Sequence, residues 1–143
     1  MLKSATRLLS CAALLCVSHA YAVTPAPESA QIYLISPEDG ATVTSPVTVR
    51  FGLKGMGVAP AGVDQVNTGH HHLLINVGTL PPLNQPLPKD AKHRHFGGGQ
   101  TETTLELPAG QHSLQLMLGD HQHIPHQPAL VSEKITINVE ATK

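Results

Sequence analysis

Hydrophobic and polar positions alternate along several short segments of this chain, and turns rich in Gly, Pro and Asp separate these segments. No segment shows a helical period, so the pattern predicts strands rather than helices. We expect strands at residues 32–35, 47–53, 71–77, 103–107, 112–118 and 132–139, with a shorter one at 41–43. Short strands at this spacing favour an all-β fold, namely an antiparallel β-sandwich with an immunoglobulin-like strand order.

The alternation also assigns the two faces of the strand that contains a triple histidine. One face is apolar and carries His71, Leu73, Ile75 and Val77. The other face carries His70, His72, Leu74 and Asn76. Because successive side chains of a strand point to opposite faces, the middle histidine is expected to point away from its two neighbours.

The N-terminus has the order of a secretory signal peptide. Lys3 and Arg7 precede an apolar run at residues 8–17, and Ala20-Tyr21-Ala22 provides an A-x-A cleavage site. The run is too short to span a membrane. We therefore expect cleavage after Ala22, a flexible leader at 23–30 and a single domain at 31–140, in a periplasmic or secreted protein without a membrane span.

Loss of the signal peptide changes the chemistry of the chain. Cys11 and Cys16 leave with it, so the remaining 121 residues can form neither a disulfide nor a thiolate metal site. Seven basic residues then stand against ten acidic ones, which gives a net charge near −3 with neutral histidine. This balance lacks the basic footprint of a nucleic-acid-binding protein.

Histidine is the most informative residue type, because it falls into three clusters that each contain an H-x-H pair. Imidazole is the commonest metal ligand in proteins. In an extended segment, residues i and i+2 project to the same side, so each pair can offer two imidazoles to one ion. The candidate ligands for zinc or copper are His70, His72, His93, His95, His121, His123 and His126.

Two further residues are candidates for a supporting role. Asp120 can accept the second ring N–H of a ligating histidine and thereby orient it. His71 faces the apolar side, where it either supports the site or belongs to the core. Soft ligands are scarce, since only Met56 and Met117 remain after the signal peptide, and a Cu(I) thioether site is not favoured.

The expected topology brings the three clusters together. In an immunoglobulin-like order, the strands at 71–77 and 112–118 are antiparallel neighbours, so His70 lies close to His121. The loop at residues 93–99 opens at the same end of the sandwich. We therefore expect one composite site at one end of the molecule.

Some of these features also have purely structural interpretations. His112 opens a core strand at a corner where such sandwiches often place an anchoring tyrosine, so we expect it to be structural. Gly97-Gly98-Gly99 allows either a flexible bend or the close approach of a ligand or backbone.

Three classes of function remain open at this stage. The histidines favour a non-catalytic protein that sequesters, delivers or senses zinc or copper. Alternatively, the chain is a cell-envelope interaction module that binds a partner protein or an anionic ligand through its His-rich loops and the Pro-rich loop at 80–92, with Lys89, Lys92 and Arg94 as cations. The third class, a metalloenzyme, has less support, because the histidines match no known catalytic ligand pattern and cleavage leaves Val23 at the mature N-terminus, where a copper histidine brace needs histidine. Nucleophilic catalysis also lacks a candidate, since Ser113 and Ser132 lie in strands without an activation motif.

Five stretches of the chain resemble a family of small exported bacterial proteins known as domain of unknown function 4399. These stretches are ISPEDGATVTSPVTVRFGLKGMGVAPAG (35–62), TGHHHLLIN (68–76), PLNQPLP (82–88), HFGGGQTETTLELPAG (95–110) and LGDHQHIPH (118–126). The resemblance implies an exported β-domain and supplies no catalytic residues, so the function has to be argued from the site.

Overall fold

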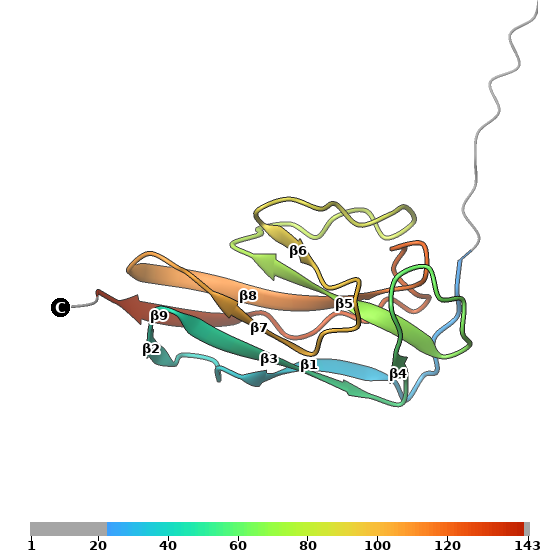
Figure 1. Cartoon of the computed structure of the whole chain (residues 1–143), viewed down its shortest axis with the longest axis horizontal. Coiled ribbons are helices and arrows are strands. Elements are labelled where there is room, and N and C mark those ends of the chain that lie inside the picture. Colours follow the sequence, from blue (N-terminus) through green and yellow to red (C-terminus); the bar gives the residue numbers. More distant parts are fainter. Residues whose placement is uncertain (1–22, 142–143) are drawn as a thin grey trace, which may run out of the picture.

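The computed structural model describes residues 23–141, which form two facing β-sheets (Figure 1). The smaller sheet has the order β1-β3-β7, with β1 at Gln31–Ser36, β3 at Val47–Lys54 and β7 at Glu102–Leu105. The larger sheet has the order β2-β9-β8-β5-β4, and β6 also pairs with β5. Its strands are β2 (Thr42–Thr44), β9 (Ile135–Glu140), β8 (Gly110–Gly119), β5 (Thr68–Ile75), β4 (Gly57–Val58) and β6 (His93–His95).

This architecture confirms the expected all-β sandwich for the described part of the chain. Most strand pairs are antiparallel, whereas β2 with β9 and β4 with β5 are parallel. The predicted adjacency of the two long strands is also found, since β5 pairs with β8 from His70↔Gly119 to Ile75↔Leu114. The narrower immunoglobulin-like assignment stays a prediction. Residues 23–141 include no helix long and apolar enough to cross a membrane.

The hydrophobic core lies between the sheets and follows the predicted alternation as far as Ile75. Val77, expected on the inner face, packs against the outer apolar cluster instead, because β5 ends at Ile75. Leu73 and Ile75 of β5 meet Leu114, Leu116 and Leu118 of β8 in this core, together with residues of the smaller sheet. The opposite face of β5 is buried as well, because the segments 76–92 and 120–131 lie over it (Figure 1). There Leu74 packs with Met117 and Leu87 in a second, smaller apolar cluster. Both faces of β5 are therefore shielded from water.

The sequence pattern missed β4 and β6 and placed the strand with the triple histidine slightly too late. Residues 93–95 were expected in a loop, but they pair with β5 in the register His72↔His95 and Leu74↔His93. Three polar residues between Pro-rich and Gly-rich segments have no periodicity of their own, so only this tertiary pairing makes them a strand. β5 ends at Ile75 because Asn76 adopts a φ of 56°, a left-handed conformation that asparagine tolerates.

The leader at 23–30 was expected to be flexible, but its first half makes backbone contacts with the segment after β8. Pro25 forms a parallel bridge with Gln127. The Gln127 N–H donates to Thr24 O at 2.9 Å, and the Ala26 N–H donates to Gln127 O at 3.0 Å. Ala30 is buried in the core. The leader is thus fastened to the segment that follows β8.

Candidate metal centre

Two histidines of the triple motif point to the outer face of the larger sheet. His70 and His72 alternate with His71 along β5, so their rings share the face that carries Leu74. Their exposed fractions are 0% and 1%. β6 adds a third ring, because its register sets His95 directly opposite His72. Pairing of two neighbouring strands thus brings these three imidazoles together.

The fourth ring comes from the turn after β8. Gly119, the last residue of β8, lies opposite His70, so the chain leaves the strand next to this histidine. The turn closes through a hydrogen bond from the His123 N–H to Asp120 O at 2.9 Å. His123 has a φ of 69°, an uncommon backbone conformation for a residue with a side chain. We call His70, His72, His95 and His123 the four-histidine cluster.

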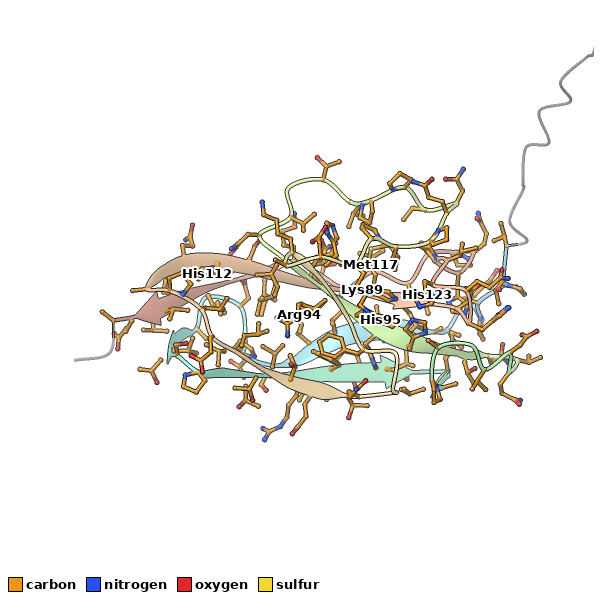
Figure 2. All side chains as sticks on the ribbon, turned by 45° about the horizontal axis from the view of Figure 1, so that its top comes forward. Lys89, Arg94, His95, His112, Met117 and His123 are labelled. Carbon is orange, nitrogen blue, oxygen red and sulfur yellow. The ribbon has the colours of Figure 1, made fainter. Side chains whose placement is uncertain are left out.

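Five of the six distances between the centroids of the four rings are nearly equal. Ring centroids are 4.9 Å apart for His70–His72 and 5.0 Å apart for His70–His95, His70–His123 and His72–His95. The remaining separations are 4.7 Å for His95–His123 and 6.1 Å for His72–His123. Figure 2 shows His95 and His123 next to each other, with His112 towards the other end of the molecule.

The ring nitrogens of three of these residues converge on one another. The Nε2 atoms of His70 and His72 are 3.0 Å apart. One ring nitrogen from each of His70, His72 and His95 lies within 4.8 Å of the others. Two zinc-bound nitrogens at tetrahedral angles are about 3.3 Å apart, given Zn–N bonds of about 2.0–2.1 Å. We call these three residues the histidine trio.

Several ring nitrogens of the trio are buried without a hydrogen-bond partner. They are His95 Nε2, His70 Nδ1 and His72 Nδ1. A buried polar atom left unpaired costs about 1–3 kcal/mol, so such a group of rings is unfavourable unless a ligand compensates for it. The Nε2 atoms of His70 and His72 lie at hydrogen-bond distance from each other, so a metal ion would replace that contact and give His95 Nε2 a partner. The two Nδ1 atoms lack the carbonyl or carboxylate acceptor that often orients a metal-bound histidine.

Burial keeps the trio neutral, which is the form that binds metals. The pKa of His70 is lowered to about 4, mainly by burial and also by the neighbouring His123 and His95, while the charge of Asp120 opposes the shift. Burial together with His70, His95 and His123 lowers the pKa of His72 to about 2. The pKa of His95 is lowered by burial and then by His123 and Lys89. Neutral imidazoles can coordinate an ion without first losing a proton.

Two glycines make room for these rings. A Cβ atom on Gly119 would lie 2.9 Å from His72 Nε2. A Cβ atom on Gly97 would lie 2.7 Å from His95 Nε2 and would contact His95 Cε1 even more closely. Of the two roles considered for the Gly97–Gly99 segment, close approach therefore applies at Gly97, where the approaching group is the protein's own His95 ring.

Three histidines that were expected beside the others have separate local partners. His93, which stands two residues before His95 on β6, has its Nδ1 2.9 Å from Asp90 Oδ1. His121 Nδ1 lies 3.6 Å from Asp64 Oδ1. His126 is buried and donates from Nε2 to Thr68 O at 3.1 Å. Each H-x-H pair outside β5 thus contributes one ring to the cluster, while Asp90 hydrogen-bonds the ring of His93 and Asp64 lies beside the ring of His121.

Asp120 has a different role from the one predicted, and His71 takes the second of its two expected roles, as a core residue. Asp120 binds no histidine ring: its Oδ1 accepts the N–H groups of Gln122 and Ile124 at 2.8 and 2.9 Å, and its Oδ2 accepts the Thr24 hydroxyl. It therefore shapes the turn that carries His123. His71 points into the core, where its ring centroid is 5.2 Å from that of Phe51. Burial lowers the pKa of His71 to about 4.

The location of the cluster also differs from the prediction. Loops at one end of the sandwich were expected to form the site, but the cluster lies on the outer face of the larger sheet. His70, His72 and His95 are strand residues, and only His123 belongs to a loop. The reason is the pairing of β6 with β5, which turns an expected loop into an additional strand of this sheet.

The remaining candidates lie apart from the cluster or on its margin. His112 is structural as predicted, since Nε2 donates to Pro108 O and Nδ1 accepts from Asn76 Nδ2, both at 2.9 Å. Lys89, Lys92 and Arg94 are all exposed. Arg94 projects from the face of β6 opposite to His95, because it stands between His93 and His95 on the strand.

Thr24 was missed by the sequence analysis. Its hydroxyl donates to Asp120 Oδ2 at 2.6 Å across 96 residues of sequence. No local pattern reports a contact of this separation. By contrast, Gly119-Asp120 followed by polar residues is a recognisable signal for a turn held by an aspartate side chain.

Comparison with known proteins identifies the family of this chain. The family model described as a domain of unknown function (DUF4399) matches residues 49–140. This chain belongs to that family. The matched residues include the whole four-histidine cluster, and the resemblance seen in the sequence is confirmed. No curated protein and no solved structure gives a significant match.

Proposed function

We propose that this protein binds a divalent transition metal ion, Zn(II) or Cu(II), through His70, His72 and His95. The observation that carries the proposal is the convergence of one ring nitrogen from each residue within 4.8 Å. Zinc, copper and nickel all accept imidazole ligands, and the described trio contains no sulfur ligand that would favour Cu(I).

The electrostatics of the site support a cation. His70 and His72 are fully buried, and their lowered pKa values keep the rings neutral at pH 7. A divalent ion bound by neutral imidazoles brings positive charge into the protein, and a buried charge is stable only near a compensating one. Asp120 is 1% exposed and close enough to act electrostatically on His70, so it supplies part of that compensation.

The proposed role is non-catalytic handling of the metal in an exported protein. A catalytic zinc site keeps a coordination position open to substrate, whereas two members of the trio are fully buried. The expected signal peptide would place the protein in the periplasm or outside the cell. Sequestration, delivery and sensing of zinc or copper are all consistent with this site.

The proposal is tested by comparing two substitutions on the same strand. His95→Ala removes a member of the trio, and His93→Ala removes the histidine two residues away, which is also half-buried. Zn(II) and Cu(II) affinities would be measured for both variants and the wild type by competition with chelators of known affinity. Circular dichroism would check that each variant is folded.

We expect one tightly bound ion per chain for the wild type and for His93→Ala. His95→Ala should bind about 100-fold more weakly, because a zinc site worth about 10–16 kcal/mol loses one of its few ligands. Wild-type binding no tighter than millimolar would overturn the proposal. Equal affinities of the two variants would overturn the assignment of His95 as a ligand.

A further inference from the structure

His123 extends the histidine trio to a four-cornered arrangement, and the shape of that arrangement distinguishes between metals. Five of the six ring separations are between 4.7 and 5.0 Å, and only His72–His123 is longer, at 6.1 Å. Four imidazoles around a tetrahedral zinc ion would have centroids about 5.2 Å apart. In a square-planar site, two of the six separations would exceed the other four by about 40%. The ring centroids therefore lie close to the corners of a tetrahedron. The ring nitrogens that lie within 4.8 Å of one another belong to His70, His72 and His95, so coordination by His123 requires its ring to turn towards the trio.

The backbone of His123 is held in an uncommon conformation by contacts on both sides. Its φ is 69°, which costs free energy that the surrounding contacts must offset. The His123 N–H donates to Asp120 O, and His123 O accepts the Leu87 N–H at 2.9 Å. The Asp120 carboxylate accepts two further N–H groups of the same turn at 2.8 and 2.9 Å. Asp120 thus holds the backbone of the turn on both sides of His123.

Thr24 donates a further hydrogen bond to the Asp120 carboxylate. Its hydroxyl donates to Asp120 Oδ2 at 2.6 Å, and the backbone bonds between residues 24–26 and Gln127 fix the leader in place. Asp120 is 1% exposed, so its hydrogen bonds lie in a water-poor environment where each contributes more than at the surface. The leader, Asp120 and the turn with His123 therefore form one connected network.

We propose that His123 is the fourth ligand of a closed, tetrahedral four-imidazole site for Zn(II), and that Thr24, acting through Asp120, positions it. This inference rests on the proposed function, because it assumes that the trio holds the ion. Thr24 is a positioning residue in this scheme and does not touch the metal. The segment immediately after the expected signal-peptide cleavage site would then control how firmly the ion is retained.

The test uses the mature chain from Val23 with three single substitutions. His123→Asn removes the ring and keeps a residue that tolerates positive φ. Thr24→Val removes the hydroxyl at nearly constant shape, and Thr24→Ser restores it. X-ray absorption on zinc-loaded protein counts the imidazoles, and absorption of the Co(II) form reports tetrahedral geometry. Release of zinc to excess chelator gives the dissociation rate.

We expect four imidazoles and the intense visible bands of tetrahedral Co(II) in the wild type, and three imidazoles in His123→Asn. Zinc release should be about 100-fold faster in His123→Asn and about tenfold faster in Thr24→Val, within the range known for residues that orient ligands. Thr24→Ser should release zinc like the wild type. In the His123→Asn background, Thr24→Val should cause no further acceleration, because its effect passes through His123.

The outcomes separate this inference from the proposed function. If the wild type binds zinc through three imidazoles and His123→Asn releases it at the same rate, the inference is wrong and the proposed function stands. If Thr24→Val accelerates release equally in both backgrounds, the positioning role of Thr24 is wrong. If the wild type binds no zinc, the proposed function itself fails.

Discussion

The two faces of β5 carry histidines in adjacent positions, yet the histidine on one face packs in the core and those on the other face join a cluster of imidazoles. His71 points into the sandwich core against Phe51, whereas His70 and His72 point outward to His95 and His123. All three residues of the triple motif are at most 1% exposed. Burial lowers the pKa on both faces, to about 4 for His71 and His70 and to about 2 for His72.

The difference between the faces lies in what surrounds each ring. The inner ring has aromatic and aliphatic neighbours, so it behaves as a core side chain. The outer rings have other imidazoles as neighbours, and their nitrogens converge. A lowered pKa alone is therefore a poor indicator of a metal site in this protein. Convergence of ligand atoms is the observation that separates a ligand from a buried core histidine.

The largest expected effect is the loss of metal binding on the outer face. His72→Ala should weaken Zn(II) binding about 100- to 1,000-fold, because it removes one of the few ligands that share about 10–16 kcal/mol of binding free energy. His71→Leu, the matched change on the inner face, should leave the affinity unchanged. Calorimetric titration of both variants with Zn(II) measures the difference. A comparable loss in His71→Leu would break the contrast between the faces.

A smaller effect is expected in the acid stability of the metal-free protein. The folded-state pKa of His71, about 4, is below its ordinary value of 6.5, so its contribution to stability is complete above pH 6.5 and is lost as the pH falls towards 4. At pH 5.5 this loss amounts to about 1 kcal/mol for His71. Between pH 7.5 and 5.5, the unfolding free energy should therefore fall less in His71→Leu than in the wild type.

Urea unfolding at the two pH values, with a chelator present, measures this difference. His70 and His72 titrate in both proteins and cancel in the comparison. An identical pH dependence of the two proteins would show that His71 is not desolvated as the structure indicates.

The smallest effect is expected from crowding a single ring of the cluster. Gly97→Ala places a methyl group against the His95 ring, which must move aside, so zinc affinity should fall about tenfold. Gly98→Ala is the matched control, because the three atoms nearest to its methyl group all belong to the Gln100 side chain. Chelator competition gives the affinities, and thermal unfolding checks that stability is similar. Equal affinities would show that His95 does not depend on the space at Gly97.

Much of this molecule was predictable from local pattern. Alternation along residues 70–77 correctly separated His71 and Leu73 from His70 and His72, because a strand presents successive side chains to opposite faces. The long strand β8 followed from the same alternation. The structural role of His112 was predicted from its place at a strand corner, and the antiparallel pairing of β5 with β8 was predicted from the assumed immunoglobulin-like strand order.

Membership of the cluster was decided by the tertiary structure. Each H-x-H motif looks the same in sequence, but Asp90 holds His93 and Asp64 lies beside His121, leaving His95 and His123 for the cluster. The register of β6 on β5 and the bond from Thr24 to Asp120 join residues far apart in the chain. The sequence alone therefore determined the strands, their faces and the supply of imidazoles. Only long-range pairing decided which four of them meet, because a periodic pattern contains no information about its partner in space.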